Sequence, residues 1–342
     1  MKSLLQLAGW SILTFTTGLT LAQDMESLPA YQPRETVSGV VRVWGNPQMQ
    51  ELVRRWGAGF QQRHPQANVV ANLQGSDVAF AGLYTKSADV ALLGRDPTAS
   101  EIQAFEWIYR YRPARVEIMT GSLGQPEKSA ALLMFVHKDN PLSALSLAQV
   151  DAIFSHEHLR GSEPITTWGQ LGLDGKWKHR RIRLYGYNAY SGTGRYFRHA
   201  VLDDSRNLNW DRLQEFGDGP ERKGKRIDAA RRIHDALAKD PYGMAVAILT
   251  PGAAASKPLA LAAAPDGPFV DATAESLISR RYPLARSVIA LVNRAPGKAI
   301  EPQVAEFLRY VLSRDGQMEV AGDGGFLPLA ADNARLQLKQ LE

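Results

Sequence analysis

The sequence contains no cysteine among its 342 residues. This absence excludes disulfide bonds, thiolate metal sites, a cysteine nucleophile and the cysteine anchor of bacterial lipoproteins. The 29 glycines and 19 prolines are too few for a collagen-like or low-complexity chain. Beyond the first 22 residues, no stretch approaches the length of a membrane-spanning helix. The formal charge of +5 is small and spread along the chain, which argues against electrostatic binding of nucleic acid.

The first 22 residues have the pattern of a secretory signal peptide. Lys2 is followed by an apolar stretch, and small residues precede a cleavage point after Ala22. A retained membrane anchor is the alternative, although Gln6 and several threonines make this segment a poor spanning helix. We expect export to the periplasm, with residues 23–37 as a polar linker to the folded part.

The remainder of the chain alternates between apolar strands and amphipathic helices. We predict strands at 40–44, 68–73, 89–93, 131–137, 181–185, 243–249, 259–263 and 287–293. Helices follow several of them: Asn46 and Pro47 are good starting residues for one helix, and apolar positions recur at helical spacing between 304 and 312. This alternation predicts α/β architecture with largely parallel sheets.

Three of the turns place small or polar residues where a helix begins, at 45–46, 75–76 and 191–193. A helix N-terminus presents unpaired N–H groups and about half a positive charge, which suits an oxyanion. Glycine lets the backbone approach a ligand closely, and serine and threonine hydroxyls add donors. Each turn alone is also what an ordinary helix cap looks like. The hypothesis is therefore a small anion held by several helix ends together.

Several short motifs occur in a fixed order along the chain. They are Pro65-x-x-x-Val69 before Gly75-Ser76, then Ala88-Asp89-Val90, Asn140-Pro141-Leu142, Ser191-Gly192-Thr193-x-x-x-Phe197, Tyr242-Gly243-Met244-Ala245 and Gly325-Phe326-Leu327-Pro328-Leu329. In number and order these motifs resemble those of the periplasmic phosphate-binding proteins of ABC transporters, which have the type II periplasmic-binding fold. The resemblance covers the chain from about Gly39 onward.

The resemblance implies a two-lobed α/β fold, each lobe a mostly parallel sheet flanked by helices, with hinge strands that allow closure over a ligand. We expect lobe 1 at 38–130 and 250–335 and lobe 2 at 131–249. The implied function is capture of inorganic phosphate by lobe closure and delivery to the membrane permease of an ABC transporter. The positions that match the family's phosphate contacts are Asn46, Ser76, Ser191, Gly192 and Thr193.

Two positions depart from the family's pattern, and both concern recognition of the anion. Many members carry arginine four residues before the Ser-Gly-Thr serine, where this chain has Tyr187. Phosphate binders also have an aspartate that accepts the proton of hydrogen phosphate, at the position of Gly94 here. That carboxylate discriminates against sulfate, which has no proton to donate. Loss of the arginine removes a charge-assisted contact of about 1.5–3 kcal/mol.

Neighbouring residues offer replacements for both missing groups. They are Arg95, Arg195 and Arg198 as cations, Asp77 and Asp96 as acceptors, and the Tyr187 hydroxyl as a donor. Each arginine also has an ordinary interpretation, which is an ion pair for Arg95 and a solvated helix face for Arg195. The ligand is therefore phosphate or another oxyanion, and a sensor or secreted accessory protein of the same fold is the alternative function.

Nothing in the sequence predicts catalysis. The one close histidine cluster, His156-Glu157-His158, lacks a third metal ligand, and Ser191 lacks the Gly-x-Ser-x-Gly pattern of a nucleophile elbow. We therefore expect a monomeric binding protein that is not an enzyme, has no cofactor or metal and binds no nucleic acid.

Overall fold

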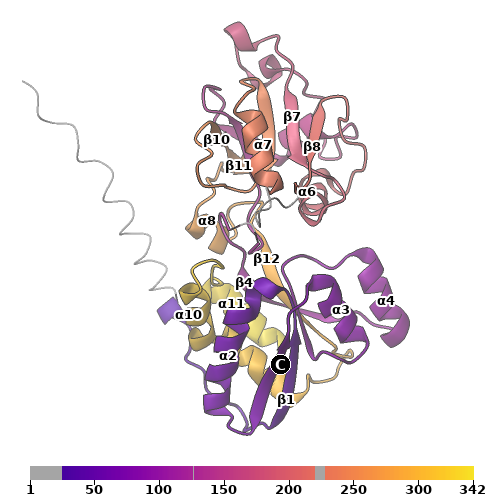
Figure 1. The fold of residues 1–342 in the computed structure, drawn as a ribbon, viewed down its shortest axis with the longest axis vertical. Coiled ribbons are helices and arrows are strands. Elements are labelled where there is room, and N and C mark those ends of the chain that lie inside the picture. The colour runs from indigo at the N-terminus through magenta and orange to yellow at the C-terminus, as the bar shows by residue number, and fades with distance from the viewer. Residues whose placement is uncertain (1–24, 126, 220–227) are drawn as a thin grey trace, which may run out of the picture. The chain divides into compact units, whose positions relative to one another are not determined.

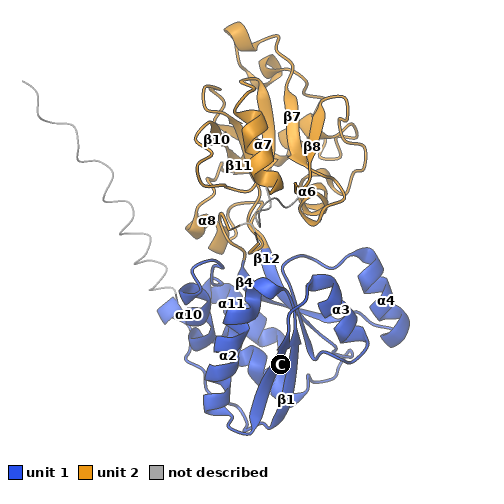
Figure 2. Cartoon of the chain, in the orientation of Figure 1, with its two compact units in different colours: residues 1–120, 287–342 blue, residues 121–286 orange. Residues whose placement is uncertain are grey.

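The computed structural model describes residues 25–125, 127–219 and 228–342. Its chain divides into two compact units, residues 1–120 with 287–342 (unit 1) and residues 121–286 (unit 2), coloured separately in Figure 2. The predicted signal peptide, residues 1–22, lies outside the described residues.

Unit 1 is built on a five-stranded sheet in the order β2-β1-β3-β12-β4. Figure 1 labels β1, β4 and β12 of this sheet. Its strands are β1 (Gly39–Trp44), β2 (Ala67–Asn72), β3 (Val90–Leu93), β4 (Ala114–Thr120) and β12 (Ser287–Val292). β1 runs parallel to β2 and β3, whereas β12 runs antiparallel to β3 and β4. The carboxyl ends of β1, β2 and β3 therefore lie at one edge of the sheet.

Helices cover both faces of this sheet. They are η1 (Pro47–Met49), α2 (Gln50–Arg63), α3 (Ser76–Tyr84), α4 (Ala99–Tyr109), α9 (Pro302–Leu312), α10 (Arg314–Gly322) and α11 (Ala331–Gln340). Along β3, Val90 and Leu92 join the core under α2 and α9, while Ala91 and Leu93 join the core under α3 and α4. This alternation follows from the two-residue period of a strand and explains why β3 is apolar throughout.

The segment predicted as a linker at 23–37 is instead part of the core of unit 1. Tyr31 is 3% exposed and lies with Leu28 and Val37 among the buried apolar residues. The Tyr31 hydroxyl donates to Glu306 Oε2 at 2.6 Å and lies 2.7 Å from His64 Nε2. The Val37 N–H donates to His64 Nδ1 at 3.3 Å, so Nε2 carries the hydrogen that Tyr31 accepts. The prediction of a linker is wrong, because this segment packs into the core. The local sequence did not indicate the packing, since the partner Glu306 lies far away in the chain.

Unit 2 is built on a second five-stranded sheet in the order β10-β5-β9-β7-β8. Its strands are β5 (Leu133–His137), β7 (Arg183–Tyr187), β8 (Leu213–Phe216), β9 (Gly243–Ala247) and β10 (Ser256–Pro258), and a small parallel pair is formed by β6 (Ala144–Ser146) and β11 (Ala260–Ala262). Its helices are α5 (Leu147–Phe154), η2 (Trp168–Leu171), η3 (Gly175–Trp177), α6 (Gly192–Leu202), α7 (Ala229–Leu237) and α8 (Ala274–Ile278). β7 runs parallel to both β8 and β9, which places three carboxyl ends at one edge here too.

The predicted lobe boundaries differ from these units. Residues 121–130 and 250–286, expected in lobe 1, belong to unit 2. The reason is strand pairing: β10 pairs with β5 and β11 with β6, and both partners lie inside 121–286. The chain therefore passes between the units at 120–121 and 286–287, where Thr120 and Ser287 are paired across β4 and β12.

All eight predicted strands are present, with ends that differ by two residues or fewer. β4, β6, β8 and β10 were not predicted. Within the described ranges, no helix combines the length and the apolar character that spanning a bilayer requires.

Candidate anion-binding groups of the two units

In unit 1, three turns follow the carboxyl ends of parallel strands, and two of them, at 45–46 and 75–76, are predicted helix starts. Asn46 follows β1, Ser76 follows β2 and Arg95 follows β3, so the sheet brings these residues to one edge. The Gly75 N–H donates to the Gly45 carbonyl at 2.9 Å and joins two of the turns directly. In open α/β sheets this edge is where ligands bind.

The first-turn N–H groups of α3 are left available because the cap residue, Gly75, has no side chain to accept from them. Gly75 adopts φ 132° and ψ 159°, a conformation that favours glycine, and provides no side-chain cap. The first intrahelical bond runs from the Ala79 N–H to the Gly75 carbonyl, at 2.9 Å. Among the described residues, the N–H groups of Ser76, Asp77 and Val78 have no acceptor. They form a set of three donors at the positive end of the helix dipole.

Asn46 has a different role in the neighbouring turn. Its side-chain oxygen accepts from the Gln48 N–H at 3.4 Å and caps η1, as the Asn46–Pro47 pattern predicts. The side-chain amide nitrogen makes no hydrogen bond within the described part of the chain, and it remains a predicted donor to the anion.

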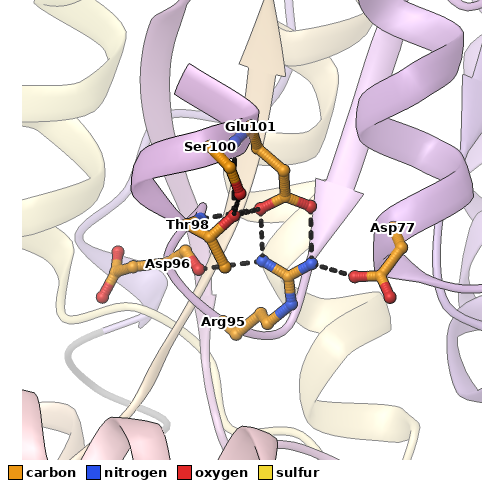
Figure 3. A network of polar contacts seen from close by, with 6 residues as sticks. All are labelled: Asp77, Arg95, Asp96, Thr98, Ser100 and Glu101. Atoms are coloured by element: carbon orange, nitrogen blue, oxygen red, sulfur yellow. Dashed lines mark hydrogen bonds and ion pairs between the residues drawn. The ribbon is translucent and has the colours of Figure 1, made fainter. Parts of the chain in front are cut away.

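Arg95 is held in an ion-pair network, drawn in Figure 3. Its guanidinium donates to both carboxylate oxygens of Glu101, at 2.7 and 2.8 Å, to the Asp96 carbonyl at 3.0 Å and to Asp77. The hydrogen bond with Glu101 raises the pKa of Arg95, and its side chain is only 15% exposed. The structure therefore favours the ion-pair interpretation, and direct ligand contact by Arg95 stays a prediction that requires an exchange of partners.

Asp77 is the better placed of the two candidate acceptors. It lies in the first turn of α3, among the unpaired N–H groups, and its side chain is 87% exposed beside Arg95. Asp96 points its carboxylate to Arg115 instead, at 3.5 Å. Arg95 thus holds a carboxylate at the start of α3, next to donors that suit an oxyanion.

In unit 2, the serine of the Ser-Gly-Thr motif serves as a helix cap. The Ser191 hydroxyl accepts from the Gly194 N–H at 3.0 Å and donates to the Asn188 carbonyl at 2.7 Å. The hydroxyl of Ser191 is thereby committed to the local turn. The N–H groups of Gly192 and Thr193, and the Thr193 hydroxyl, make no hydrogen bond to any residue that the structure describes. Gly192 and Thr193 are therefore the available donors of this motif.

Tyr187 ends β7 at the same sheet edge as the start of α6. Its oxygen accepts from the Ile248 N–H at 3.1 Å, so its own O–H proton is directed elsewhere. Burial raises the pKa of Tyr187 far above its usual range, which keeps the hydroxyl protonated as a donor. The Ile248 carbonyl in turn lies 3.0 Å from Nε2 of buried His234. Sequence reasoning missed His234 and Ile248, because nothing in their local sequence indicates contact with Tyr187.

Two arginines on α6 differ in their surroundings. Arg195, exposed in the first turns of the helix, has no ion-pair partner in the described ranges. Arg198 stacks over the Tyr190 ring, with the guanidinium carbon 5.8 Å from the ring centroid. Arg195 is therefore the predicted cation that remains available to a ligand.

The chain is similar to known proteins over most of its length. The sequence matches a model described as a PBP superfamily domain over residues 30–315. The phosphate-binding protein PstS of Pseudomonas aeruginosa is 33% identical over 319 residues, which cover 92% of this chain and 91% of that protein. The chain belongs to the PBP superfamily, in the family of PstS-like binding proteins.

Solved structures agree with this PstS-like fold. PstS from Borrelia burgdorferi matches with a TM-score of 0.55 at 17% identity, covering 85% of this chain and 99% of that chain. An ABC-type phosphate transport receptor from Vibrio cholerae matches with a TM-score of 0.53 at 17% identity, covering 84% and 100%. The family resemblance and the α/β fold class predicted from the sequence are confirmed. Because the family consists of binding proteins, the prediction that the chain is not an enzyme is confirmed at that level.

The predicted site residues form two groups, one in each unit. Asn46, Ser76 and Arg95 share one sheet edge of unit 1, and Tyr187, Ser191, Gly192, Thr193 and Arg195 share one sheet edge of unit 2. Within the described residues, no group of three histidine, aspartate or glutamate side chains is arranged to hold a metal ion.

Proposed function

We propose that this PstS-like protein captures inorganic phosphate outside the cytoplasm and delivers it to an ABC transporter. The observation that carries the proposal is the matching pair of helix N-termini. α3 in unit 1 and α6 in unit 2 each follow a parallel strand and keep N–H donors without acceptors in the described chain. The name of the Pseudomonas aeruginosa relative, a phosphate-binding protein, supports the choice of anion.

The chemistry of these groups suits hydrogen phosphate. Its oxygens accept hydrogen bonds from the first-turn N–H groups of α3 and α6 and from the hydroxyls of Thr193 and Tyr187. Its proton is donated to the carboxylate of Asp77, which Arg95 holds beside the α3 donors. Fully ionised sulfate has no such proton and meets a repulsive carboxylate instead. Binding therefore needs no metal and breaks no bond.

We propose that one phosphate ion contacts both groups of donors. Ligand binding then favours the closed arrangement of the two units through the greater affinity of that arrangement for the anion. A membrane permease that recognises the liganded protein is the proposed partner, and the protein acts as a monomer. The signal-peptide pattern of residues 1–22 supports a periplasmic location.

A second candidate function keeps the fold and changes the ligand. Tyr187 stands where the resemblance to phosphate-binding proteins implies an arginine, and the guanidinium of Arg95 is already paired with Glu101 and Asp77. Fewer cations then face the anion, which favours another oxyanion or a sensory or accessory role.

Calorimetric titration of the purified mature protein with phosphate, arsenate, sulfate and molybdate separates these functions. Phosphate capture predicts a dissociation constant below about 1 µM for phosphate with no sulfate response. Tighter binding of sulfate or molybdate supports the second candidate. Silence toward all four anions contradicts both binding functions.

A further inference from the structure

A cluster of arginines lies at the edge of the unit 2 sheet opposite to the edge with Tyr187 and α6. Arg183 is the first residue of β7, Arg212 immediately precedes β8, and Tyr242 immediately precedes β9. Because these three strands are parallel, the residues share the amino-end edge. Strands of four or five residues separate this edge from the carboxyl ends by about 13–17 Å. The two regions therefore cannot share one small ligand.

These residues line a surface depression of about 380 Å³. Its polar and aromatic lining is Arg180, Arg181, Arg183, Arg212, Asp211 and Tyr242. Among the described residues, two carboxylates pair with these four guanidinium groups: Asp211 with Arg181 at 3.0 Å and Asp240 with Arg183 at 3.0 Å. The depression thus carries an excess of two positive charges.

The two remaining arginines are fixed by neutral groups. The guanidinium carbon of Arg180 lies 4.8 Å from the centroid of the Tyr242 ring. Arg212 donates to the backbone carbonyls of Ile153 and Ile165, at 2.9 and 3.3 Å. These contacts restrict the orientation of both side chains without neutralising their charge. Arginines fixed in this way lose less conformational entropy when they bind an anion.

We propose that this depression binds a ligand that carries two or more adjacent phosphate groups. Guanidinium groups match phosphate oxygens in bidentate pairs. Arg180 and Arg212 are held by different neutral groups, so each guanidinium is placed to pair with its own phosphate group. A single phosphate ion at this exposed surface has to compete with Asp211 and with water, and such isolated pairs contribute little. A chain of phosphates, whether a soluble polyphosphate or a cluster of phospholipid headgroups, contacts several arginines at once and gains from multivalency.

The test uses the mature protein with saturating inorganic phosphate present, so that the site proposed for capture is filled. Calorimetric titration with tripolyphosphate at about 0.15 M salt measures binding to the basic depression, and the double variant R180Q/R181Q removes two of its charges. The matched control R54Q/R112Q removes two exposed, ion-paired arginines from unit 1, those paired with Glu51 and Glu106. We expect R180Q/R181Q to weaken binding by at least about tenfold and the control to change it less than twofold.

Cosedimentation with phosphatidylglycerol vesicles, compared with phosphatidylcholine vesicles, distinguishes the two sources of phosphate. Binding of tripolyphosphate alone assigns a soluble chain, and binding of the anionic vesicles alone assigns a lipid surface, provided that R180Q/R181Q abolishes it. Equal losses in both double variants indicate unspecific charge attraction and overturn the proposal, as does the absence of any binding. None of these outcomes changes the calorimetric response to inorganic phosphate. The proposed phosphate capture is therefore tested separately from the proposal made here.

Discussion

Replacing Tyr187 with phenylalanine removes a hydroxyl that is engaged on one side and free to donate on the other. Its oxygen accepts from the Ile248 N–H at 3.1 Å, and its proton has no acceptor among the described residues. Without the oxygen, the N–H of Ile248, the residue that follows β9, loses its partner, which costs about 1–3 kcal/mol of unfolding free energy. Without the proton, an anion bound at this edge loses one charge-assisted bond of about 1.5–3 kcal/mol, or about 10- to 150-fold in affinity.

Two measurements separate these effects. Urea denaturation of the phosphate-free protein gives the change in stability, and calorimetric titration gives the change in phosphate affinity. Tyr190→Phe is the matched control, because Tyr190 lies in the same turn, is 72% exposed and uses only its ring to contact Arg198. We expect the control to leave both quantities nearly unchanged. A Tyr187→Phe protein that binds phosphate within twofold of the unmodified protein refutes the role of Tyr187 as a donor.

Three other outcomes are expected. Asp77→Asn removes the candidate acceptor for the phosphate proton, so titrations should show the preference for phosphate over sulfate falling by about tenfold or more, and an unchanged preference argues against this role. Tyr31→Phe removes a hydrogen bond from each of two buried partners, His64 and Glu306, and should lower the free energy of unfolding by about 2–4 kcal/mol. Tyr310→Phe is the control, because the Tyr310 hydroxyl has no hydrogen bond to any described residue, and it should cost less than about 1 kcal/mol. Burial lowers the pKa of His64 and of His234, so the unfolded chain takes up protons first as the pH falls. Stability should therefore decline below about pH 6.5, by up to about 1.4 kcal/mol per pH unit for each histidine, and denaturation curves that are flat between pH 7 and pH 5 would contradict this.

The strand framework was predictable because most strands are locally apolar. β3, β5, β9 and β12 are buried along nearly their whole length, and such runs are visible without any structure. β8 was missed because Gln214 and Glu215 break its apolar run. The local start signals of helices were equally clear, and Asn46 caps η1 as predicted.

Contacts between distant segments could not be predicted from one sequence. Tyr31 depends on Glu306, 275 residues away, and a segment with scattered apolar residues therefore resembled a linker. The assignment of 250–286 failed for the same reason, because it rests on the pairing of β10 with β5. In the candidate site, local sequence identified Tyr187 and the Ser-Gly-Thr turn, but the hydrogen bond from Ile248 spans 61 residues. For Arg95, an ion pair was one of two open interpretations, and the local sequence did not identify Glu101 as the partner.

Proline at the first helical position tests most directly whether the N–H donors of both units bind one phosphate ion. This position tolerates proline, and both Gly75 (ψ 159°) and Ser191 (ψ 160°) have the extended ψ that a residue before proline requires. Ser76→Pro deletes a donor in unit 1, and Gly192→Pro deletes one in unit 2. Ala99→Pro, at the first position of α4, is the control.

The decisive measurement is the phosphate dissociation constant of these three variants by calorimetry. We predict that Ser76→Pro and Gly192→Pro each weaken binding by about tenfold or more, while Ala99→Pro binds as the unmodified protein does. If either of the first two variants keeps full affinity, that unit does not supply its helix N-terminus to the anion, and phosphate capture by both units is contradicted.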